Sequence, residues 1–109
     1  MLRSDLWVSA FVRRHNDIGH ICVISRRGDN LAGQIAVEID HLDGTISLLT
    51  PAPAIAHLDT ADRLFTLRLD HVAAPAVRDQ LTRELDFDSD MWVVSLEMRG
   101  SNYGLEIVK

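Results

Sequence analysis

The sequence has little of what several classes of protein depend on. Its single cysteine, Cys22, rules out an internal disulfide and favours a reducing compartment, so we expect a cytoplasmic protein. Sixteen acidic residues outnumber eleven basic ones, and a net charge of -5 does not supply the positive field of a general nucleic-acid binder. No run of about 18 apolar residues is present, so we predict no membrane span.

Signals of cofactor, metal or catalytic chemistry are also scarce. The six glycines all fall at expected turns, loop boundaries or element ends, which leaves none for a phosphate-binding loop. Asp86, Asp88, Asp90 and Glu97 have the spacing of an EF-hand loop, but Met91 stands where that loop requires glycine. The five histidines show no helical or strand spacing typical of metal ligands. We therefore predict no metal, no cofactor and no catalytic residues.

The strongest structural signal surrounds Asp43-Gly44. Apolar and polar residues alternate on both sides of it, which is typical of a β-hairpin with one buried face. A two- or four-residue loop would put the odd-numbered apolar residues of the first strand on the face of Ile46 and Leu48. A three-residue loop would set Ile39 opposite Ser47 and expose one apolar row, so we expect the former.

The remaining patterns complete a single domain over residues 1–109. They are a helix from Ser4 to about Asn16, a strand over Ile21–Ser25 covered on both faces, the hairpin over 34–50, a loop over 51–62, a strand over Arg63–Asp70, a helix from Pro75, and a closing hairpin of 91–98 with 103–108. The order is α-β-β-β-β-α-β-β. We predict an α+β fold with two helices and a single antiparallel, mainly meander sheet of about six strands.

The first helix has a wide apolar arc. Trp7 and Phe11 share one face with Leu6, Ala10 and Ile18. Arg14 lies at the edge of this aromatic patch, and arginine beside aromatic residues is enriched at protein interfaces. Alternatively, its stem lies along the core with the charged head in water. The interface residues predicted are Trp7, Phe11 and Arg14, with a homodimer or another protein as the partner.

Positive charge is concentrated at the start of the chain. Residues 1–28 carry five arginines and two aspartates, whereas the remainder carries six basic and fourteen acidic residues. If the first strand returns along the helix, its last residues lie near free amide groups at the helix N-terminus, which favours an anion site. Alternatively, Asp5 and Asp29 neutralise the arginines in weak surface pairs. The predicted ligand-binding residues are Arg3, Ser4, Arg26 and Arg27.

Several short motifs resemble those of a small uncharacterised bacterial domain family of this length. They are Leu6-Trp7-Val8, Arg13-Arg14, Arg26-Arg27-Gly28-Asp29 with Ala32-Gly33, Leu42-Asp43-Gly44, and the segment from Phe87 to Val94. The family pattern has proline where this chain has Ser89, which loosens one turn. The resemblance supports a single domain and implies no activity.

Two functions remain open at this point. The first is a non-enzymatic interaction or accessory domain that self-associates, since no catalytic set is present and the sheet has edges that can pair. The alternative is a domain that binds a small anion, such as a phosphate or nucleotide-like compound, through the arginine cluster.

Overall fold

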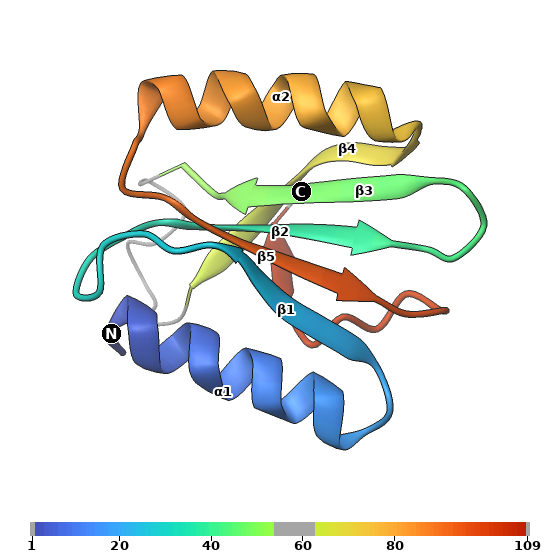
Figure 1. Ribbon diagram of the computed structural model, residues 1–109, viewed down its shortest axis with the longest axis horizontal. Helices are drawn as coiled ribbons and strands as arrows, with labels where there is room; N and C mark the ends of the chain where they lie inside the picture. Colours follow the sequence, from blue (N-terminus) through green and yellow to red (C-terminus); the bar gives the residue numbers. More distant parts are fainter. Residues whose placement is uncertain (1, 54–62, 109) are drawn as a thin grey trace.

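A computed structural model describes residues 2–53 and 63–108 of the chain, so most of the loop predicted over 51–62 lies outside the described residues. Two helices and six strands follow in the predicted order (Figure 1). They are α1 (Ser4–Asp17), β1 (Ile21–Arg26), β2 (Ile35–Asp40), β3 (Ile46–Pro51), β4 (Leu64–Val72), α2 (Ala74–Phe87), β5 (Trp92–Glu97) and β6 (Glu106–Val108).

The sheet is mixed, and the predicted antiparallel meander is wrong. Its strand order is β1-β5-β2-β3-β4-β6, with β5 parallel to β2 and β6 parallel to β4. After β4 the chain crosses the sheet through α2 and returns as β5 on the far side of β2 (Figure 1). A helical crossover of this kind is what allows strands to run parallel. The predicted closing hairpin does not form, because both edges of β5 are already paired, one with β1 and one with β2.

The hairpin of β2 and β3 is confirmed, but its predicted register is wrong. Ile39 lies opposite Ser47, and the turn spans residues 41–45. Leu48 therefore faces the other side of the sheet, where it is fully buried in a cluster with Val77 of α2. The prediction assumed one buried face. Because a helix covers each face, both apolar rows of the hairpin are buried.

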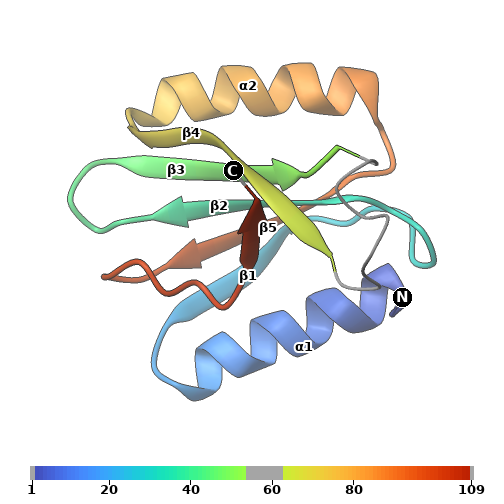
Figure 2. The ribbon, with the colours of Figure 1, turned by 180° about the vertical axis from the view of Figure 1, so that it is seen from behind.

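Helices α1 and α2 lie on opposite faces of the sheet (Figures 1 and 2). The predicted inner face of α1 is only partly correct, since Leu6 and Ile18 are 50% and 65% exposed. Its buried residues are Ser4, Val8, Phe11 and His15. The predicted apolar stripe of α2 is confirmed, with Val77 buried and the leucines at 81 and 85 packed beside it. The larger core thus lies between α1 and the sheet, and a smaller one lies beneath α2.

Strand β1 forms one edge of the sheet and is covered on one face only. Ile21 and Val23 are more than half exposed, so the prediction of a strand covered on both faces is wrong. The outer edge is partly closed by Asn16 of α1, whose side-chain amide donates to the carbonyl of Cys22 and accepts from its N–H, both at 2.9 Å. An edge blocked in this way is a poor template for pairing with another chain.

Candidate functional site

The N-terminus of α1 is occupied by contacts within the chain. The amide groups of Ser4 and Asp5 donate to the carbonyls of Leu31 and Asn30, at 3.3 and 3.0 Å. The Ser4 hydroxyl makes no capping hydrogen bond to the helix and donates to the carbonyl of Gly33 at 2.6 Å. The free amides that the predicted anion site required are therefore not available.

The three arginines predicted for that site have separate partners. Arg3 forms an exposed ion pair with Asp5 at 3.0 Å, as the alternative interpretation expected. Arg26 donates to the carbonyl of Met91 at 2.7 Å and to that of Ser89 at 2.9 Å. The guanidinium carbon of Arg27 lies 5.9 Å from the ring centroid of the tryptophan that begins β5. The structure does not bring the three arginines together around one ligand.

A different arginine contacts Ser4. The guanidinium Nη2 of Arg63 donates to the Ser4 hydroxyl at 2.9 Å and to the carbonyl of Leu2 at 3.2 Å. Its Nε–H is buried and has no acceptor among the described residues. No described carboxylate lies within ion-pairing distance, and burial lowers the pKa of the guanidinium from its usual value. Arg63 is therefore a partly buried cation without a counter-ion in the described chain.

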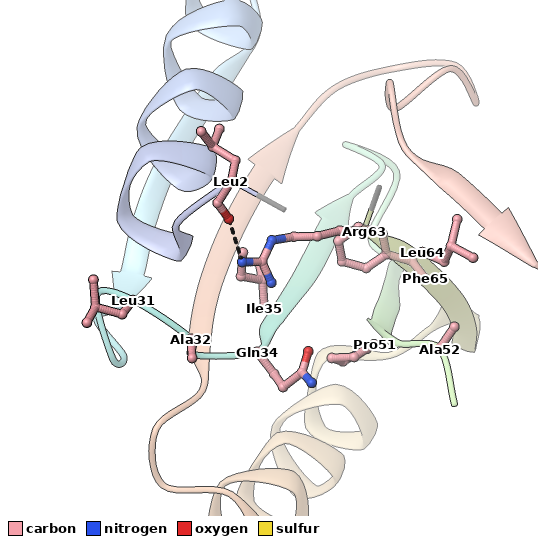
Figure 3. A pocket seen from close by; sticks show the side chains of 10 residues that line it. All are labelled: Leu2, Leu31, Ala32, Gln34, Ile35, Pro51, Ala52, Arg63, Leu64 and Phe65. Carbon is pink, nitrogen blue, oxygen red and sulfur yellow. Dashed lines mark hydrogen bonds between the residues drawn. The ribbon is translucent and has the colours of Figure 1, made fainter. Parts of the chain in front are cut away.

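Arg63 lines a pocket of about 440 Å³ at the end of the sheet where β2 begins and β3 ends, which we call the Arg63 pocket. Figure 3 shows its side chains, with Arg63 reaching toward Leu2. The lining residues are Leu2, Leu31, Ala32, Gln34, Ile35, Pro51, Ala52, Arg63, Leu64 and Phe65. A mostly apolar pocket of this size with few polar groups is typical of small-ligand sites.

Of these two residues, Ser4 was predicted from the sequence and Arg63 was not. This residue stands at the start of a predicted strand and is followed by two apolar residues, a pattern that any edge of a sheet could show. Arg63 contacts Ser4 only because β3 and β4 bring it beside the first turn of α1. No local spacing signals that proximity.

Of the three predicted interface residues, Phe11 is buried, Trp7 is half-buried and Arg14 is exposed. Phe11 is 1% exposed, and Trp7 stacks on it with ring centroids 5.1 Å apart. Trp7 also contacts Phe65, at 5.8 Å between centroids. The guanidinium carbon of Arg14 lies 5.8 Å from the Phe11 ring, which agrees with the stem-on-core alternative. Binding of a partner at this surface stays a prediction, and Phe11 is closed to a partner in this conformation.

Four histidines meet in two pairs, which their spacing in the sequence did not indicate. His15 and His20 share a hydrogen bond of 2.8 Å between their Nδ1 atoms. The rings of His41 and His71 stack with centroids 3.7 Å apart, and His71 Nδ1 lies 2.6 Å from an Asp70 carboxylate oxygen. Within residues 2–53 and 63–108, no group of three or more histidine, cysteine, aspartate or glutamate side chains is placed to hold a metal ion.

These pairs predict that stability falls as the pH is lowered below about 6.5. Burial lowers the pKa of both His15 and His41 from the usual 6.5, with the charge of the neighbouring histidine acting in the same direction. The unfolded chain therefore binds more protons than the folded one, so stability is complete above pH 6.5 and is lost as the pH falls through the lower folded pKa values. Urea unfolding of the wild type, His15→Gln and His41→Gln between pH 5 and pH 8 measures this dependence. Variants as steep as the wild type would contradict the assignment.

Cys22 is buried at 2% exposure, and burial raises the pKa of its thiol to about 11. A thiol of this kind is a core residue and a poor nucleophile at neutral pH. Neither helix of the described chain has the length and hydropathy that a bilayer span requires.

Comparison with known proteins places this chain in a family. Residues 2–106 match the family described as "Protein of unknown function (DUF1491)". The chain belongs to the DUF1491 family. A solution structure of a protein from A. tumefaciens is similar to it, with 35% identity, a TM-score of 0.86, and coverage of 99% of this chain and 95% of that one.

Two structures of DUF1491 proteins from Caulobacter crescentus CB15 are also similar. A crystal structure has 27% identity and a TM-score of 0.80, and covers 99% of this chain and 98% of that one. An NMR structure has 27% identity and a TM-score of 0.81, with coverage of 99% and 97%. A search of curated proteins found no match to the DUF1491 chain. The predicted resemblance to a bacterial family without an assigned function is confirmed.

Proposed function

We propose that this DUF1491 protein is a non-enzymatic domain that binds a small anionic ligand in the Arg63 pocket. The observation that carries the proposal is the guanidinium of Arg63, which has no carboxylate partner and an unbonded Nε–H among the described residues, beside an apolar cavity. A partly buried charge without a counter-ion lowers the free energy of unfolding. A bound anion would supply the counter-ion and offset this loss of stability. The described residues that line the pocket include no histidine, cysteine, serine, tyrosine or carboxylate, which supports binding without catalysis.

Anion binding is the second function predicted from the sequence, but the arginine proposed to bind the anion is a different one. The anion would lie on Arg63, with Ser4 orienting the guanidinium, instead of on Arg26 and Arg27. Self-association or a protein partner stays a prediction, and the inward position of Phe11 together with the Asn16 contact at β1 makes it the weaker of the two. A cytoplasmic location belongs to the same proposal, in keeping with the single free thiol of the sequence.

Replacing Arg63 with methionine tests the proposal. A thermal-shift screen of anionic metabolites should contain a compound that stabilises the wild type by about 2.7 kcal/mol at a hundredfold excess over its Kd. Arg63→Met should abolish this stabilisation. Without ligand the variant should be as stable as the wild type or more so, because an apolar residue replaces an uncompensated charge.

Arg68→Met provides the matched control. Arg68 belongs to β4, its side chain is 51% exposed, and it lies 4.0 Å from a glutamate of α2, away from the residues that line the pocket. This variant should keep the full ligand shift. Equal shifts in the wild type and in Arg63→Met would refute the proposed site.

A further inference from the structure

We infer that the ligand of the Arg63 pocket is a carboxylic acid with a compact apolar body, an inference that rests on the proposed function. Arg63 and Gln34 are the only described lining residues with polar side chains. The walls are otherwise formed by leucine, isoleucine, alanine, proline and phenylalanine side chains. A ligand that fits must bury apolar surface and place one charged group at one end of the pocket.

The number of available donors favours carboxylate over phosphate. A phosphate or pyrophosphate group takes several charge-assisted hydrogen bonds, commonly from backbone amides at a helix N-terminus. The first amides of α1 are already bonded to the carbonyls of Asn30 and Leu31. Among the described lining residues, Arg63 is the single cation, and one guanidinium matches the charge and planar shape of one carboxylate.

The donors that remain on Arg63 are consistent with a single carboxylate. Leu2 and Ser4 take hydrogen bonds from Nη2, whereas Nη1 makes no hydrogen bond within the described residues. The side-chain amide of Gln34, an exposed residue of the same pocket, likewise has no partner there. A carboxylate oxygen that accepts from Nη1 would use a donor that the described chain leaves open.

The rim of the pocket is apolar as well. Leu2 and Leu31 both line it and are 50% and 63% exposed. Exposed leucines at the mouth of an apolar cavity add contact area for the part of a ligand that extends outwards. Affinity should therefore rise with the length of the apolar body until the cavity and its rim are covered.

Isothermal titration calorimetry with butanoate, hexanoate and octanoate measures this dependence on the full chain. Each added methylene should improve the Kd about fourfold while the chain still fits. The matching primary amides should bind at least about tenfold more weakly, as expected for the loss of a charge-assisted hydrogen bond. Arg63→Met should remove the difference between acid and amide, and Arg68→Met should retain it. N-acetyl-leucine represents a polypeptide C-terminus. Comparing its Kd with those of the free acids distinguishes a peptide from a free acid as the source of the carboxylate, and tighter binding of either one supports the inference.

Inorganic phosphate and a nucleoside monophosphate are titrated in the same way, as anions of the alternative class. Binding of either one that depends on Arg63, with no binding of the acids, would overturn the carboxylate class and leave the proposed anion site standing. Acids that bind without dependence on chain length would also overturn it. Acid binding that Arg63→Met leaves unchanged would remove both the inference and the proposed function.

Discussion

Gly28→Ala should lower the free energy of unfolding by about 3 kcal/mol or more, as expected for overpacking against atoms that cannot move aside. A Cβ atom at Gly28 would lie 2.1 Å from the carbonyl oxygen of Asp90 and 2.8 Å from the carbonyl carbon of Met91. Both are backbone atoms of the two residues just before β5, where the amide of Asp29 donates to the same Asp90 oxygen. The loop after β1 must therefore separate from β5. Urea unfolding followed by circular dichroism measures the loss.

Gly100→Ala is the control for this substitution. Gly100 has a φ of 89° with nothing within 4 Å of its Cβ position, so only left-handed strain of about 1 kcal/mol is expected. A Gly28→Ala loss no larger than that of Gly100→Ala would show that the loop does not pack as described.

The same loop connects folding to the proposed site. Its residues Leu31 and Ala32 line the Arg63 pocket, and its carbonyls hold the first turn of α1. We therefore expect Gly28→Ala to weaken ligand binding together with stability, whereas Gly100→Ala should leave binding unchanged. This separates an effect on the pocket from a general loss of stability.

The sequence predicted the elements well because their signals are local. Alternation around Asp43-Gly44 and the stripe through Val77 depend on neighbours within a few residues, and both elements are present. The sheet order was not predictable in the same way, since it depends on which strands meet after a helical crossover. The sequence does contain one indication that β5 is a central strand. Trp92, Val93 and Val94 form an unbroken apolar run, which is typical of a central strand covered on both faces.

In the candidate site, too, the local features could be predicted from the sequence and the tertiary contacts could not. A cation beside the first turn of α1 was predicted, and Ser4 is part of that arrangement. The identity of the cation depended on tertiary structure, because Arg63 reaches Ser4 only through the pairing of β3 and β4. Arg26 instead donates to carbonyls of the segment just before β5, a strand whose position next to β1 the sequence did not reveal.

Trp92→Ala should cost about 3–5 kcal/mol, as expected for truncating a fully buried tryptophan. Trp92 is 0% exposed and belongs to the core cluster beneath α1. Its indole N–H donates to the carbonyl of Asp29 at 2.8 Å, so the side chain also fastens the loop after β1. Trp92→Phe retains most of the apolar contact and loses the indole donor. This should cost about 1 kcal/mol, because the Asp29 carbonyl keeps its hydrogen bond from the Gly33 N–H at 3.2 Å.

Trp7 provides both the probe and the matched comparison. It is the other tryptophan of the sequence and remains as a fluorophore in the Trp92 variants, so unfolding can be followed by its emission in urea. Trp7 is only partly buried against the same cluster, so Trp7→Ala, followed by circular dichroism, should cost less than Trp92→Ala. The reverse ranking would show that the contacts of Trp7 contribute more to the stability of this cluster than those of Trp92.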